Sequence, residues 1–133
     1  MRTSKPVSAT TTTVVGPLHS FALYTSIAIG NDGLPVISYA DSAGGLKVAR
    51  CVTPACTGTA TISTVDSATT AGTFSSIAVG ADGLPVISYL DETDGGFLKV
   101  AKCTTADCGG AVTLTSVDDP ANAVGFDSEI AIG

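Results

Sequence analysis

The chain has 133 residues, of which 44% are hydrophobic and 14% are charged, with 12 acidic and 6 basic side chains. This length suffices for one domain, and the many aliphatic residues exclude intrinsic disorder as a description of the whole chain. The net charge of -6 argues against a nucleic-acid partner, and no apolar run approaches the roughly 20 residues that a membrane-spanning helix needs.

An internal repeat dominates the sequence. Residues 26–41 return as residues 76–91 with an offset of 50, and residues 46–51 return as residues 98–103 with an offset of 52. The two extra residues fall between these blocks, so we place them in a loop. A third copy begins at Ser128.

The repeat divides the chain into two whole units flanked by two fragments. The N-terminal fragment carries Thr11–Val15, which aligns with Thr61–Val65 at the end of the first unit. The predicted segments are an N-terminal strand and linker (1–23), a first repeat (24–73), a second repeat (74–125) and the first strand of a third repeat (126–133).

Within each unit, apolar residues alternate with small or polar ones, which is the period of a β-strand. In the first repeat the alternation predicts strands around residues 26–29, 36–39 and 46–51, and a fourth strand at Thr61–Val65. The second repeat follows the same order and ends with a strand at Val112–Val117. Glycine-rich turns separate the strands, and no helix is needed.

We therefore predict an all-β fold. A unit of about 50 residues with four antiparallel strands is typical of a propeller blade, so we expect four-stranded antiparallel propeller-type blades in tandem. The alternative is a β-sandwich, in which the two units would pack face to face. Near-identical repeats favour blades, because they favour identical interfaces between neighbours.

The four cysteines form two C-x4-C pairs, Cys51 with Cys56 and Cys103 with Cys108, each at the end of the third strand of its repeat. This placement predicts two local disulfides, which indicate an oxidising compartment. A zinc site with four thiolates is the alternative, but equivalent positions on successive repeats would lie a whole unit apart.

The string S-I-A-[IV]-G-x-D-G-L-P-V-I-S-Y-x-D, followed by L-K-V-A-[KR]-C and C-x4-C, resembles the tandem repeats of large secreted bacterial proteins with propeller-like β arrays. The resemblance runs from Tyr24 onward. It implies an extracellular or cell-surface repeat protein, and it carries no catalytic or ligand-binding motif.

No residue pattern points to catalysis. His19 is the only histidine and lies outside the two whole repeats, so a nucleophile, histidine and acid triad has no place in them. Acidic turn residues such as Asp32 and Asp82 are interpreted as bonding the nearby backbone, not calcium. We predict no enzyme activity, no cofactor and no metal site.

Two blades do not close a ring, which typically needs about four to eight. Exposed blade faces and strand edges would then need partners, and other copies of the chain are the nearest source. We expect head-to-tail self-assembly into a filament or ring, through terminal strands that carry Val14 and Val15 at one end and Ile130 and Ile132 at the other. The alternatives are a chain cut from a longer array and terminal segments that fold back over the blades.

A secreted carbohydrate-binding module is the second functional hypothesis. Tyr39 and Tyr89 recur at one position of the repeat, and an aromatic ring there could stack on a glycan. Both lie on the same predicted face as Ile37 and Ile87, which favours packing between blades instead.

Overall fold

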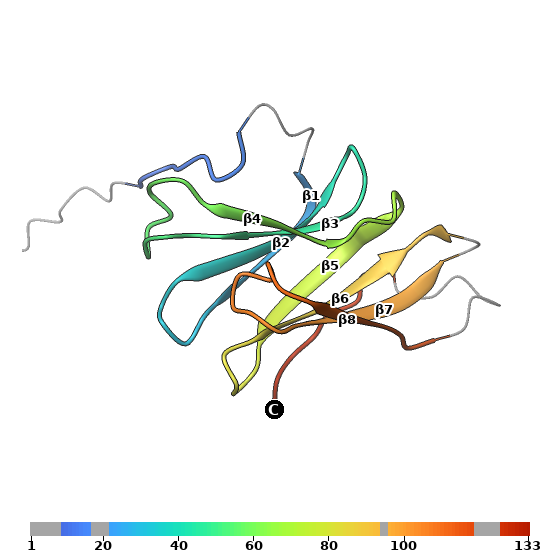
Figure 1. Ribbon diagram of the computed structural model, residues 1–133. Coiled ribbons are helices and arrows are strands. Elements are labelled where there is room, and N and C mark those ends of the chain that lie inside the picture. Colours follow the sequence, from blue (N-terminus) through green and yellow to red (C-terminus); the bar gives the residue numbers. More distant parts are fainter. Residues whose placement is uncertain (1–8, 17–21, 94–95, 119–125) are drawn as a thin grey trace, which may run out of the picture.

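The computed structural model describes residues 9–16, 22–93, 96–118 and 126–133, which form two four-stranded antiparallel sheets and no α-helix (Figure 1). The predicted all-β fold is confirmed. The first sheet consists of β1 (Ala22–Ile29), β2 (Pro35–Asp41), β3 (Leu46–Arg50) and β4 (Thr61–Asp66). The second consists of β5 (Ala71–Val79), β6 (Pro85–Asp91), β7 (Phe97–Cys103) and β8 (Val112–Ser116).

Each sheet is a meander whose strands follow one another in chain order. The first hairpin turns at Gly33, which has φ of 80° and donates its N–H to the Gly30 carbonyl at 2.9 Å. Pro35 and Pro85 begin β2 and β6, where a missing N–H disturbs the ladder least. Local turn chemistry thus sets the order of the strands.

The two sheets pack against each other around one hydrophobic core (Figure 1). The contacts between them are concentrated at β1, β2 and β5 and thin out toward the fourth strands. We call the two sides that meet the inner faces and the opposite sides the outer faces. The buried core residues are Val36, Leu46, Val48, Val65, Ala71, Ile77, Ile87, Tyr89, Ala101, Cys103 and Cys108.

The two sheets approach each other closely at Gly72. It has φ of +104°, and a Cβ atom there would lie 3.0 Å from the Leu46 Cα. We expect Gly72→Ala to lower the free energy of unfolding by about 2 kcal/mol, because it combines a disfavoured φ with a backbone clash. Urea unfolding measures the loss.

Gly33→Ala is the matched control for Gly72. Gly33 also has a positive φ, of +80°, but no atom lies within 4 Å of the Cβ it would gain. We expect this control to lose about 1 kcal/mol, from conformation alone. Equal losses in the two variants would show that the sheets do not crowd at Gly72.

The terminal segments differ from the prediction. Residues 9–16 contain a bend at Val14 and Val15, and residues 126–133, with Ile130 and Ile132, contain a turn; neither segment is a strand. The expectation of strand structure there is corrected, because a strand needs a backbone ladder and neither segment forms one with a sheet. Their role in docking stays a prediction.

Candidate functional site

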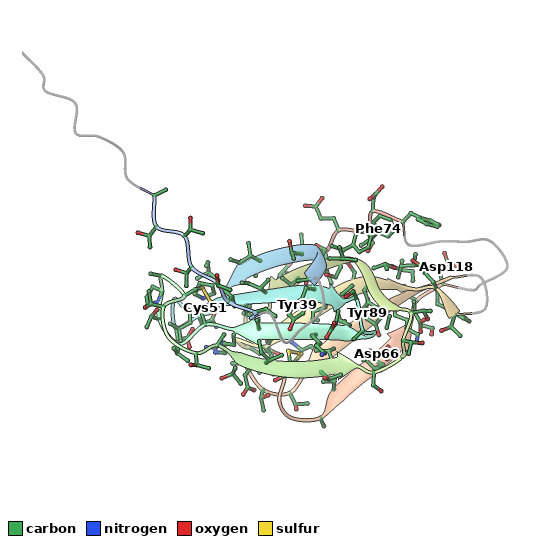
Figure 2. The ribbon with its side chains drawn as sticks, turned by 90° about the horizontal axis from the view of Figure 1, so that it is seen from above. Tyr39, Cys51, Asp66, Phe74, Tyr89 and Asp118 are labelled. Atoms are coloured by element: carbon green, nitrogen blue, oxygen red, sulfur yellow. A yellow bond between two sulfur atoms is a disulfide. The ribbon has the colours of Figure 1, made fainter. Side chains whose placement is uncertain are left out.

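A buried polar cluster joins the inner faces of the two sheets. The Tyr89 hydroxyl on β6 donates to Asp66 Oδ2 at the end of β4, at 2.7 Å, and Figure 2 shows the two residues close together. Lys99 Nζ lies 3.7 Å from the same carboxylate oxygen. Burial raises the pKa of Tyr89, and its hydrogen bond to the Asp66 carboxylate raises it further. The hydroxyl therefore stays protonated and acts as a donor.

Asp91 extends this cluster within the second sheet. Its carboxylate accepts hydrogen bonds from Lys99 Nζ at 2.5 Å, from the Thr70 hydroxyl at 2.8 Å and from the Thr93 hydroxyl at 2.7 Å. Burial alone would raise the pKa of Asp91, but these hydrogen bonds outweigh it and hold the pKa below its usual 3.8. Asp91 is thus a buried, ionised carboxylate.

The first strands of the two sheets are joined by side chains. The Ser75 hydroxyl on β5 donates to the Tyr24 carbonyl on β1 at 2.8 Å, and the Ile77 N–H donates to Ser26 Oγ at 3.2 Å. Ser75 Oγ also lies 2.9 Å from Ser38 Oγ on β2. These contacts fix how the second sheet sits on the first.

Residues 128–130 repeat the same contacts one unit later. The Ser128 hydroxyl contacts the Phe74 carbonyl at 3.4 Å and Ser88 Oγ at 3.2 Å, and the Ile130 N–H donates to Ser76 Oγ at 3.2 Å. The C-terminal segment therefore sits on the outer face of the second sheet as β5 sits on the first sheet.

A row of aromatic rings runs along β1, β5 and the C-terminal segment. The rings of Tyr24 and Phe74 lie 4.6 Å apart between centroids, and those of Phe74 and Phe126 lie 5.5 Å apart. A groove of about 320 Å³ beside the row is lined by Tyr24, Thr25, Ser26, Phe74, Ser75, Ser76, Asp127, Ser128 and Glu129. The row spans the first sheet, the second sheet and the C-terminal segment.

The repeat allows the inner face of the second sheet to be compared with the outer face of the first. Ile77, on the inner face, is 5% exposed, whereas its equivalent Ile27, on the outer face, is 61% exposed. Ile29 is exposed on the same outer face. The outer face of the first sheet therefore displays apolar side chains that the second sheet buries.

Tyr39 differs from its equivalent in its hydrogen bonding. Both rings are buried, with Tyr39 1% exposed and Tyr89 0% exposed, so neither is available to stack on a sugar. The Tyr89 hydroxyl has its acceptor, but the Tyr39 hydroxyl is buried without a hydrogen-bond partner. Burial also raises the pKa of Tyr39, with a further contribution from the Asp41 charge.

No family model, curated protein or solved structure matches this chain. The functional argument therefore rests on the repeat and on the geometry of its interfaces.

The cysteines pair as the spacing predicts. Disulfides join Cys51 to Cys56 and Cys103 to Cys108, each across a sequence separation of 5. The alternative of a four-thiolate zinc site is wrong, because all four sulfurs are consumed in these bonds. Each disulfide closes the loop that leads into the fourth strand of its sheet.

The acidic turn residues bond the backbone. Asp32 Oδ1 accepts the Leu34 N–H at 3.1 Å, and Asp82 Oδ1 accepts the Leu84 N–H at 3.0 Å. In the part of the chain that the structure describes, no three His, Cys, Asp or Glu residues gather as a metal site. No helix in that part is long and apolar enough to span a membrane. His19 lies outside the described residues.

Sequence reasoning missed the residues that link the sheets. Asp66 and Lys99 carry the polar cluster, yet neither was singled out. A signal was present, since residues 61–66 and 113–118 both read T-[IL]-[ST]-[ST]-V-D, which makes Asp118 the equivalent of Asp66. An acid that recurs at the end of an outermost strand could have indicated a contact between units.

Proposed function

We propose that the protein is a non-catalytic extracellular structural protein that self-assembles head to tail, its sheets acting as propeller-type blades. The observation that carries the proposal is the repeat equivalence between the outer face of the first sheet and the inner face that the second sheet buries. Ile27, 61% exposed on that outer face, is the equivalent of Ile77, which is 5% exposed.

The same relation holds at the other end. The inner face of the first sheet is the repeat equivalent of the outer face of the second sheet. A single movement relates the first sheet to the second. Applied once more, the same movement places the first sheet of another copy on the outer face of the second sheet. A contact of this kind is heterologous and yields a ring or a filament.

The C-terminal segment supports completion by strand exchange. Residues 130–133 have the sequence Ile-Ala-Ile-Gly, identical to residues 27–30 at the end of β1. They already sit where β1 of a stacked copy would lie, because Ile130 contacts Ser76 as Ile77 contacts Ser26. In the assembly they give up this place to the incoming β1 and pair with its edge, since β1 is an outer strand of its sheet. Strand addition supplies main-chain hydrogen bonds.

Val14 and Val15, the N-terminal docking residues, belong to the incoming copy and lie at the same junction between copies. Val14 and Val15 align with the end of β4, and therefore with the end of the fourth predicted strand of the second repeat, Val112–Val117. In the stacked pair they meet the fourth strand of the preceding copy.

The extracellular location is supported by the cysteine chemistry. Two disulfides fit an oxidising compartment, and the repeat string resembles that of large secreted proteins. The packing between the sheets is densest at β1, β2 and β5 and thins out toward the fourth strands, which supports blades arranged around an axis.

Native mass spectrometry and negative-stain electron microscopy of the purified chain test the proposal. We expect rings or filaments at micromolar concentration, and a monomer at every accessible concentration would refute self-assembly. Ile132→Lys should raise the dissociation constant at least about tenfold, because it places a charge on the exchanged strand. Ile132 is 47% exposed, so the monomer fold tolerates the change.

Val52→Lys is the matched control for Ile132→Lys. Val52 has a similar exposed fraction, 51%, and lies in the disulfide loop that follows β3, outside the strands and terminal segments of the proposed junction. We expect its assembly constant to stay within about twofold of the wild type. Equal weakening by both variants would show a nonspecific effect of added charge.

A further inference from the structure

Residues 126–130 lie on the outer face of the second sheet and make there the contacts that β5 makes on the first sheet. The Ile130 N–H donates to Ser76 Oγ at 3.2 Å. The equivalent bond on the first sheet, from the Ile77 N–H to Ser26 Oγ, has the same length of 3.2 Å. The C-terminal segment is therefore held as the first strand of a further repeat would be.

The backbone of this segment supports the same assignment. Tyr24 in β1 and Phe74 in β5 have positive φ, of 51° and 52°, and each lies at a register shift of its strand. Asp127, at the equivalent position, has φ of 52°. Residues other than glycine rarely adopt this conformation. Its recurrence shows that the C-terminal segment has the backbone shape of β1 and β5 at this point.

We infer that residues 126–130 are a cap that opposes assembly, because they occupy the site on which β1 of another copy docks. This inference rests on the proposed head-to-tail assembly and adds the step that limits it. The incoming β1 carries Ile27 at the position of Ile130, and Ile27 is 61% exposed in the single chain. Thr25, at the position of Ser128, is exposed as well. The incoming strand is accessible, and docking requires only that the cap leaves.

The cap covers only part of the docking site. Val65, on β4, belongs to the core that the two sheets share and is 6% exposed. Its equivalent in the second repeat, Val117, is 57% exposed although the cap lies on the same sheet. An incoming sheet buries Val117 as well, so it gains apolar contact that the cap does not make. A second copy therefore displaces the cap once the concentration of copies is high enough.

Phe126 holds the cap without taking part in docking. Its ring packs on the Phe74 ring with 5.5 Å between centroids. An incoming β1 would bring Tyr24 to this place instead, as Tyr24 and Phe74 meet at 4.6 Å within the chain. The Phe126 side chain is 58% exposed, so its replacement leaves the two sheets intact. A substitution of Phe126 therefore loosens the cap alone.

Sedimentation equilibrium of the full chain tests the inference with Phe126→Ala. We expect this variant to lower the dissociation constant of assembly about fivefold, because loss of one ring contact raises the fraction of chains whose docking site is open. Hydrogen exchange of the Ile130 amide in the monomer should be faster than in the wild type, because that amide is bonded only in the closed cap. Phe126→Tyr keeps the ring and is the matched control, and its dissociation constant should stay within about twofold of the wild type.

Val117→Lys changes the docking site and leaves the cap in place. It puts a charge on the part of the outer face that only an incoming sheet buries, so we expect the dissociation constant to rise at least about tenfold. The two variants should thus shift assembly in opposite directions. Shifts in the same direction would overturn the cap, because loosening it would then not favour docking.

The outcomes separate the cap from the proposed function. A wild-type chain that assembles at least as tightly as Phe126→Ala leaves the proposed function standing and overturns the cap. If both chains stay monomeric at every concentration, the proposed function and the cap fail together. If only Phe126→Ala assembles, the cap is supported, and the proposed function fails for the wild-type chain.

Discussion

Replacing all four cysteines by alanine is expected to lower the free energy of unfolding by about 4 kcal/mol. Each disulfide spans a sequence separation of 5, and the loop entropy removed from the unfolded chain at that size is worth about 2 kcal/mol. A domain of this size has a total stability of roughly 5–15 kcal/mol, so the loss is a large fraction of it.

Paired variants identify what each disulfide contributes. Cys51→Ala with Cys56→Ala should lose about 2 kcal/mol. Cys103→Ala with Cys108→Ala should lose more, because both cysteines of that pair belong to the hydrophobic core. Chemical reduction of the wild-type chain during urea unfolding provides the control. An unchanged urea midpoint in the fourfold variant would show that the loops are held by their hydrogen bonds alone.

The strands and disulfides could be predicted because they depend on residues close together in the sequence. Alternation, glycine turns and the prolines at the starts of β2 and β6 act locally. The C-x4-C spacing likewise closes a loop inside one repeat. A single repeat contains all the information that these features need.

The faces of the sheets could not be predicted in the same way. Val36 and Ile37 are neighbours on β2 that point to opposite faces, and both are apolar, so the alternation does not say which face is inner. Tyr39 and Tyr89 lie within identical local strings, V-I-S-Y, yet only one has an acceptor. The difference comes from the neighbouring sheet, which local sequence does not encode.

The terminal segments show the same limit. Residues 130–133 repeat the string of β1, and the pattern alone predicts a strand. In the single chain these residues lie beside β5 without a backbone ladder. As the equivalent of β1 they would pair with a β2, but β2 already pairs with the chain's own β1. A strand pattern in the sequence indicates a propensity for extended backbone. The strand forms only where another strand is available to pair with it.

Asp91→Asn is expected to lower the free energy of unfolding at pH 7 by about 3 kcal/mol, because it leaves the Lys99 ammonium without its buried counter-charge. The substitution should also change the response to acid. The pKa of Asp91 is held below its usual 3.8 in the folded protein, so its ionised form contributes stability above that pH, and the contribution is lost as the pH falls through the lowered pKa.

The wild-type chain should therefore lose stability steeply below about pH 4, and the Asp91→Asn variant should lose less over the same range. Urea unfolding between pH 2 and 7 measures both slopes. Asp82→Asn is the control, since Asp82 pairs with Lys102 at 3.0 Å on the surface, where solvent screens the pair. We expect a much smaller loss for this control. If the two variants shift the acid limb equally, the Asp91 cluster is not what ties stability to pH, and the carboxylates of the exposed turns share that role.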